Sequence, residues 1–124
     1  MQNTLLINIV AADCKPEDEK KFNSWYDEVH IPFLLKFKGL LSVARYKLAG
    51  GADGQARYLA VYEFASHKDF ENYTNSPELA AARAEMAQTW GEKGIDIKWR
   101  AQYELLRRWT RNLAENPLWK DSGG

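Results

Sequence analysis

The sequence has little of the chemistry that ties a protein to nucleic acid, a membrane or an oxidising compartment. Cys14 is the only cysteine, so no internal disulfide can form. Lys and Arg number 17 and Asp and Glu also number 17, so no net charge favours nucleic acid or anionic lipid. No apolar run approaches the ~18 residues of a membrane span, and the first residues lack the pattern of a signal peptide. We therefore expect a cytoplasmic protein that binds neither nucleic acid nor membrane.

Ligands for a metal or a nucleotide cofactor are also scarce. The two histidines, His30 and His67, lie far apart in the sequence and Cys14 stands alone, so no metal-ligand spacing occurs. Gly50 and Gly51 lie in a turn-like stretch rather than in a phosphate-binding loop between a strand and a helix. We expect neither a metal nor a cofactor.

Aromatic residues, in contrast, are abundant. They make up 13% of the 124 residues, whereas 45% hydrophobic and 27% charged residues are ordinary for a globular protein. A single domain is expected from the length. Aromatic rings line both cores and apolar ligand pockets, so this excess fits either use.

Alternating and helical patterns predict a βαββαβ order of elements. Strands are expected over residues 4–11, 40–48, 57–64 and 95–109, from the alternation of apolar side chains. The first helix follows Pro16 and is closed by Gly39, and the second begins at Ser66 and restarts at Ser76-Pro77. This order predicts an α+β, ferredoxin-like fold, an antiparallel four-stranded sheet with two helices on one face.

Both faces of this sheet are expected to be apolar. The last predicted strand places Ile95, Ile97, Trp99, Ala101 and Tyr103 on one face and is longer than a small monomeric sheet needs. We therefore expect a homodimer in which two sheets pack face to face. The domain is assigned to residues 1–111, and residues 112–124 form a tail that we expect to act as a latch on the partner subunit.

The first predicted helix contains the motif Phe22-Asn23-Ser24-Trp25-Tyr26-Asp27-Glu28-Val29-His30-Ile31-Pro32, followed by Gly39 and Tyr46. This motif resembles that of the EthD-like proteins of the dimeric α+β barrel superfamily. The likeness covers residues 4–109, although Lys38-Gly39 stands where many relatives have Pro-Gly. It implies a dimeric α+β barrel that binds a small, often aromatic or lactone-like, molecule between sheet and helices. Activities in this superfamily range from isomerases and dehydratases to cofactor-free monooxygenases, so the fold alone does not choose a reaction.

His30 is the leading candidate for chemistry. It lies at the edge of the apolar stripe of its helix, and Pro32 removes the hydrogen bond to the Glu28 carbonyl, which predicts a kink just after His30. Asp27 is the nearest residue able to orient the imidazole. The resemblance implies an acid/base role for His30, and the alternative is a boundary histidine that only caps a broken turn.

Six further residues complete the predicted site. Tyr46 is expected to assist His30 by donating a hydrogen bond to a carbonyl or an enolate; its alternative role is a core or interface aromatic. Arg83 shares a helical stripe with apolar residues, and it either clamps a substrate carboxylate or pairs with an acid of the partner chain. The expected substrate-binding residues are Trp25, Tyr26, Tyr62, Arg83 and Trp90.

These residues favour a cofactor-free lyase or isomerase, of a dehydratase or cyclase type, acting on a small aromatic or lactone-like metabolite by proton transfer at His30. One alternative is a cofactor-independent monooxygenase acting on a deprotonated phenol, which O₂ consumption would reveal. Another is a non-catalytic dimer that only binds a metabolite. Binding without any effect of His30 variants on turnover would favour that reading.

Overall fold

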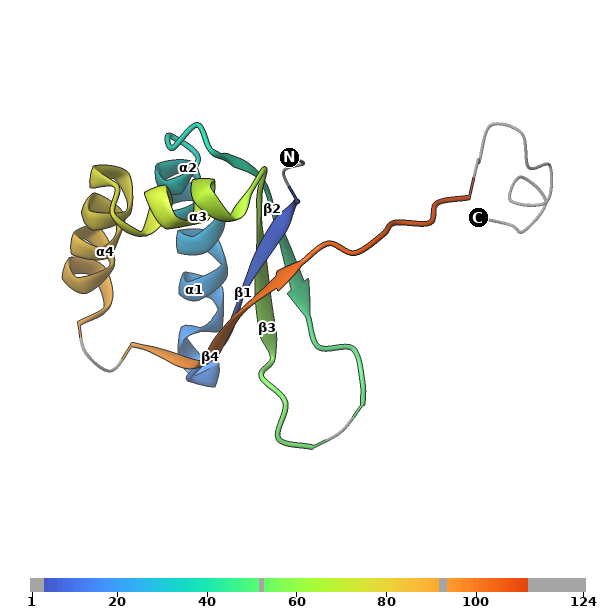
Figure 1. The fold of residues 1–124 in the computed structure, drawn as a ribbon. Coiled ribbons are helices and arrows are strands. Elements are labelled where there is room, and N and C mark those ends of the chain that lie inside the picture. The colour runs from blue at the N-terminus through green and yellow to red at the C-terminus, as the bar shows by residue number, and fades with distance from the viewer. Residues whose placement is uncertain (1–3, 52, 92–93, 112–124) are drawn as a thin grey trace.

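A four-stranded antiparallel sheet forms one layer of the protein, and the helices lie together on one side of it (Figure 1). The computed structural model describes residues 4–51, 53–91 and 94–111. The strands are β1 (Leu6–Cys14), β2 (Leu40–Lys47), β3 (Tyr58–Phe64) and β4 (Ile95–Glu104), in the spatial order β2-β3-β1-β4. The predicted α+β class and the ferredoxin-like order of elements are confirmed.

The first helix is one column made of several segments. A short 3-10 turn (Pro16–Asp18) leads into α1 (Glu19–Trp25), a π-helical turn (Tyr26–His30) and α2 (Ile31–Leu34). The amide of Ile31 donates to the carbonyl of Tyr26, five residues earlier. Because Pro32 has no amide hydrogen to offer Glu28, the widened turn falls where the sequence predicts a break, and the helix continues rather than stopping.

The second helix is divided as expected into α3 (His67–Thr74) and α4 (Pro77–Trp90). Ser66 Oγ accepts from the amide of Asp69 at 3.1 Å, and Ser76 Oγ accepts from the amide of Leu79 at 3.1 Å. Each serine therefore satisfies a free amide at the start of its helix. None of the helices in the described residues is long and apolar enough to cross a membrane.

The core lies between the helical layer and the facing side of the sheet. Its largest fully buried side chains are Phe22, Phe64, Leu6 and Leu34. Aromatic rings contact one another throughout this layer, for example Phe64 with Tyr73 at 4.9 Å between ring centroids. Many of the aromatic side chains are therefore part of the packed core.

A β-bulge in β4 exchanges the two faces of that strand. Ala12 of β1 pairs with Ile97 and Ala11 pairs with Trp99, so Lys98 has no partner across the ladder. Ile97 consequently faces the helices while Trp99 faces away from them, and Arg100 returns to the helical side. The prediction that Ile95, Ile97 and Trp99 share one face is wrong for this reason.

A second bulge has the same effect at the start of β2. The register shifts between Leu40 and Ser42, which leaves Leu40 and Arg45 on the helical side. Tyr46 pairs with Leu59 on the opposite side of the sheet. Strict alternation over residues 40–48 would put Leu40 and Tyr46 on one face, and the bulge places them on opposite faces.

The side of the sheet that carries no helix is here called the open face. It is mostly apolar, and its residues include Ile7, Ile9, Ala44, Tyr46, Leu59, Val61, Trp99, Ala101 and Tyr103. Tyr46 and Tyr103 are each 56% exposed, and Trp99 is 41% exposed. The open face thus presents aromatic surface that no described part of the chain covers.

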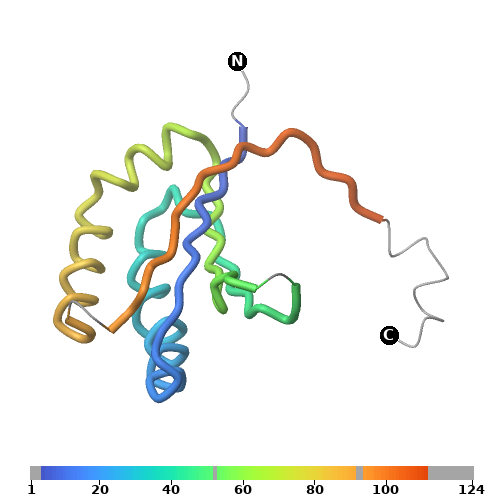
Figure 2. The backbone as a smooth tube through the Cα atoms, turned by 90° about the horizontal axis from the view of Figure 1, so that it is seen from below, coloured from blue at the N-terminus to red at the C-terminus, as the bar shows by residue number. Residues whose placement is uncertain are grey.

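Strand β4 ends at Glu104 rather than at residue 109 as predicted. The amide of Leu105 donates to the carbonyl of Leu5 at 2.8 Å, and residues 105–111, here called the arm, then run away from the sheet (Figures 1 and 2). Leu106 and Trp109 on the arm are 98% and 76% exposed. The predicted latch at residues 112–124 lies outside the described residues.

Candidate functional site

A cavity of about 110 Å³ lies between the helices and the helical side of the sheet. Its apolar wall includes Val10, Leu34, Leu79, Met86 and Ile97. Its polar wall contains His30, three tyrosines, two arginines and the pair Asn8 and Gln102, whose side chains are joined by a 2.8 Å hydrogen bond. Titratable groups and apolar surface therefore meet in one enclosed place, as is typical of a small-molecule site.

His30 enters this cavity from the π-helical turn. The imidazole is only 8% exposed, whereas a regular helix would leave it at the edge of the apolar stripe. Its ring stacks on Trp25 at 4.5 Å and meets the edge of Tyr26 at 5.2 Å. The widened turn therefore brings Tyr26 and His30 to the sheet together.

Burial decides the charge of His30. Removal from water lowers the pKa of the imidazole to about 4, and the nearby carboxylate of Glu85 opposes this only in part. Nδ1 is buried and has no hydrogen-bond partner among the described residues. His30 is therefore a neutral imidazole at pH 7, with a ring atom that the described chain leaves unpaired.

The depressed pKa predicts a stability difference that depends on pH. An unfolded histidine protonates near its ordinary pKa of 6.5, whereas folded His30 protonates near 4, so folding loses stability as the pH falls between these values. The advantage of wild type over His30→Gln in free energy of unfolding should shrink by about 3 kcal/mol from pH 7 to pH 4. Urea titrations at a series of pH values measure this.

His67→Gln is the matched control, because the His67 side chain is 63% exposed. Its stability should follow that of wild type across the same pH range. Parallel curves for wild type and His30→Gln would show that His30 is not held neutral by burial.

Trp25 supports His30 from behind rather than lining the cavity. Its indole Nε1 donates to Glu85 Oε1 at 2.8 Å, and Glu85 also accepts from the hydroxyl of Thr89. The stacked indole is thereby fixed in position, and it fixes the imidazole in turn. Trp25 therefore holds His30 in position without lining the cavity formed by the described residues, and its contact with a substrate stays a prediction.

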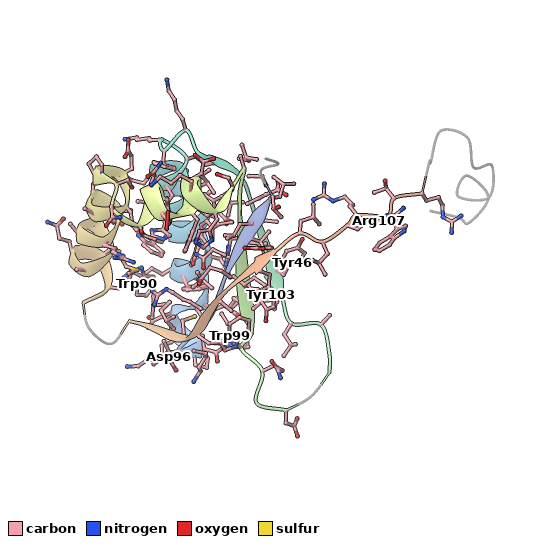
Figure 3. All side chains as sticks on the ribbon, in the orientation of Figure 1. Tyr46, Trp90, Asp96, Trp99, Tyr103 and Arg107 are labelled. Atoms are coloured by element: carbon pink, nitrogen blue, oxygen red, sulfur yellow. The ribbon has the colours of Figure 1, made fainter. Side chains whose placement is uncertain are left out.

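Trp90 is likewise outside the cavity wall formed by the described residues. It packs edge-on against Trp25 at 5.8 Å and lies at the end of α4 (Figure 3), with the Lys21 ammonium 4.2 Å above its ring. The helical stripe shared with Arg83 does not bring it into the cavity, because Phe22 and Trp25 occupy the space in front of it. Its role in substrate binding also stays a prediction.

Asp27 does not orient His30. Its carboxylate is exposed and accepts from Arg45 Nη1 at 2.7 Å. Arg45 also donates to Asn23 and lies over the ring of Tyr26 at 4.6 Å. The acidic residue that acts on His30 is Glu85 of α4, which no spacing along the first helix indicates.

Two buried phenols face each other at the cavity. The Tyr62 hydroxyl donates to the Tyr26 hydroxyl at 3.4 Å, and burial is the main reason that the pKa of each phenol is raised. Both therefore remain protonated. Since Tyr26 accepts this hydrogen bond, its own proton is available to an oxygen atom in the cavity. The predicted pair Tyr26 and Tyr62 is brought together with His30.

Arg83 of α4 also lines the cavity. Arg100 of β4, Tyr73 of α3 and Met86 of α4 line it as well. Sequence reasoning does not identify Tyr73 or Arg100. Arg100 reaches the cavity because of the bulge at Lys98. A bulge depends on the pairing between strands, so an alternating sequence pattern does not reveal it.

Tyr46 lies on the other side of the sheet from His30. With Leu48, Leu59 and Trp99 it borders a separate hollow of about 270 Å³ on the open face, where Figure 3 shows Tyr46 and Trp99. The prediction that Tyr46 assists His30 in one cavity is wrong within a single chain, because the bulge at Leu41 turns Tyr46 outward. The larger hollow is bordered by no histidine or carboxylate among the described residues.

The fold and the cavity define an α+β protein of the ferredoxin-like type, with a pocket between its sheet and its helices. A family model described as a domain of unknown function, DUF4286, matches residues 5–102, so the chain belongs to that family. No curated protein matches the sequence.

Solved structures share the fold at low sequence identity. An EthD family protein from Bacillus halodurans C-125 is 16% identical with a TM-score of 0.62, over 83% of this chain and 99% of that one. A putative monooxygenase from Shewanella loihica PV-4 is 23% identical with a TM-score of 0.53, over 87% and 100%. A dimeric protein of unknown function from Bacteroides fragilis NCTC 9343 is 17% identical with a TM-score of 0.56, over 82% and 96%. The resemblance to EthD-like proteins is thus confirmed at the level of the fold.

Proposed function

We propose that this protein is a cofactor-free lyase or isomerase that moves a proton on a small organic molecule bound in the cavity. The observation that carries the proposal is the neutral, buried imidazole of His30 in a cavity wall shared with protonated phenols. A neutral imidazole accepts a proton, and a protonated phenol donates a hydrogen bond to the oxygen on which charge develops. These are the two groups that enolisation of a carbonyl compound needs.

The reaction begins when His30 removes a proton from the carbon next to a carbonyl group. The electron pair of that C–H bond forms a C=C bond, and the carbonyl π electrons move to oxygen, giving an enolate that accepts from the Tyr26 hydroxyl. In an isomerase, the imidazolium returns the proton to another carbon of the delocalised anion. In a dehydratase, the enolate re-forms the carbonyl and a C=C bond as the C–O bond to the hydroxyl group on the next carbon breaks, and the imidazolium gives its proton to that oxygen, which leaves as water.

The low pKa of His30 suits a base that acts beside a developing anion. The free imidazole remains unprotonated and ready at neutral pH. When the enolate forms, its negative charge stabilises the imidazolium across an enclosed space where charges interact strongly. Proton transfer therefore becomes more favourable as the reaction proceeds.

Cofactor-independent oxygenation is the second candidate function. The Shewanella loihica neighbour is described as a putative monooxygenase, which supports this candidate only through a shared fold. The same base would convert a phenol into a phenolate that reacts with O₂. Oxygen consumption coupled to substrate loss would favour this reaction over lyase or isomerase chemistry.

Proton exchange provides the direct test of the first candidate. Enolisable aryl ketones and lactones are incubated with the protein in D₂O, and deuterium incorporation at the carbon next to the carbonyl is followed by NMR. We expect exchange that saturates with substrate, needs no added metal or nucleotide and consumes no O₂. Saturable binding with no exchange, turnover or O₂ uptake would instead favour a non-catalytic binding protein.

We also propose that a second copy of this chain covers the open face. Tyr46, Trp99 and Tyr103 present exposed aromatic surface there, and the arm that follows β4 exposes Leu106 and Trp109. The Bacteroides fragilis neighbour, described as dimeric, supports a homodimer by its fold. Light scattering should give twice the monomer mass of 14.3 kDa.

A further inference from the structure

Two positive charges from different elements line the same cavity without a negative charge beside them. Arg83 comes from α4 and Arg100 from β4, and no carboxylate belongs to the cavity wall formed by the described residues. Neither guanidinium forms an ion pair or a side-chain hydrogen bond within the described ranges, whereas Arg45, Arg57 and Arg108 all do. The described cavity wall therefore contains two guanidinium groups whose N–H donors have no side-chain partner within the described ranges.

The phenol of Tyr73 lies within electrostatic range of both Arg83 and Arg100. This phenol lies in the cavity wall, and burial raises its pKa while Arg83 and Arg100 each oppose that rise. Both guanidinium groups therefore lie within electrostatic range of Tyr73, although their residues are 17 positions apart in the sequence. Two like charges that line one cavity favour an anion bound between them.

The position of Arg100 depends on the β-bulge in β4. Without the bulge at Lys98, strict alternation from Ile97 would place Trp99 on the helical side and Arg100 on the open face. In the structure, Arg100 pairs with Val10 and lies on the helical side, next to Asn8 and Gln102. Both arginines are exposed residues, so a ligand can reach them from solvent.

We propose that Arg83 and Arg100 together hold the carboxylate of a small monocyclic carboxylic acid, whose ring extends into the cavity toward His30 and Tyr62. The planar guanidinium group matches the two oxygens of a carboxylate. A cavity of about 110 Å³ is of the order of one that admits a single ring. The inference gives the proposed reaction a substrate class, small monocyclic carboxylic acids. It rests on the proposed function only for the turnover step, because the carboxylate is bound by the arginines and not by His30.

Benzoate is the probe for this site, and benzamide is its neutral counterpart of nearly equal shape. Calorimetry or NMR titration at pH 7 should show that wild type binds benzoate more tightly than benzamide. Each of Arg83→Ala and Arg100→Ala should weaken benzoate binding by about tenfold or more, since each removes hydrogen bonds to a charged group. Benzamide binding should change little in either variant.

Arg107→Ala is the matched control, because it removes the same charge from the arm rather than from the cavity wall (Figure 3). It should bind benzoate as wild type does. Three results would overturn the proposal: no saturable binding of benzoate to wild type, equal losses in Arg107→Ala, or unchanged benzoate affinity in the Arg83 and Arg100 variants. In the last case, a weaker dimer would show that the arginines pair with the second chain.

Failure of this inference and failure of the proposed function are distinguishable. His30→Gln should still bind benzoate saturably and more tightly than benzamide, because the carboxylate is held by the two arginines. If the arginine variants lose benzoate but proton exchange survives in His30→Gln, the carboxylate site stands and the reaction at His30 does not. If His30→Gln abolishes exchange while the arginine variants bind benzoate normally, the reaction stands and the carboxylate site does not.

Discussion

His30→Gln should lower turnover by about 10²- to 10⁴-fold while the protein remains folded. Glutamine keeps a polar side chain of similar size but cannot take a proton from carbon. In wild type, kcat/KM should rise with pH around the pKa of about 4 and stay level at neutral pH, because only the neutral imidazole accepts a proton. Steady-state kinetics from acidic to neutral pH, with near-UV circular dichroism to confirm packing, measure both effects.

His67→Gln again serves as the control and should keep the wild-type rate. Near-normal turnover in His30→Gln would reduce His30 to a packing residue of the π-helical turn. A wild-type rate that falls as pH rises through the same range would mean that the imidazolium donates a proton, contrary to the proposed base. If glutamine disturbs packing, His30→Asn provides a second variant with the same loss of basicity.

Trp99→Asp should dissociate the homodimer. Trp99 lies on the open face beside Tyr46, and a buried interface tryptophan commonly contributes about 2 kcal/mol or more. A symmetric interface contains both copies of the changed residue, so the dimer dissociation constant should rise by about 10³-fold or more. Light scattering over a dilution series should show the monomer mass of 14.3 kDa at concentrations where wild type is dimeric.

Leu35→Asp is the comparison for this change, because Leu35 is 45% exposed but follows α2 on the helical side of the protein. It introduces the same charge without touching the open face, and it should remain dimeric. A dimeric Trp99→Asp variant would place the contact between subunits elsewhere, and a monomeric wild type would remove the proposed homodimer altogether.

The order of elements and the helix starts could be predicted because they depend on short-range signals. Ser66 and Ser76 cap the helices as their positions indicate, and Pro32 marks the altered turn after His30. What the local pattern does not contain is the form of that turn. Whether a helix stops, bends or widens at a proline depends on how the next segment packs, here Leu34 in the core.

The faces of the edge strands could not be predicted, for a different reason. One unpaired residue at Leu41 and another at Lys98 reverse the side on which all later residues of each strand lie, and an alternating sequence looks the same with or without them. The bulge at Leu41 turns Tyr46 away from His30, and the bulge at Lys98 brings Arg100 to the cavity. Glu85 and Tyr73 reach the site from α4 and α3, so only tertiary packing shows their place.

The bulge at Lys98 makes the chemistry of the cavity depend on the length of the chain as well as on its composition. Deleting that one residue would force half of β4 to turn over: either Ile95 and Ile97 would leave the core, or Trp99 would enter the cavity and Arg100 would leave it. No substitution at a single position has this effect. A gain or loss of one codon within a strand is therefore a route by which related domains with this sheet can exchange a charged pocket for an apolar one.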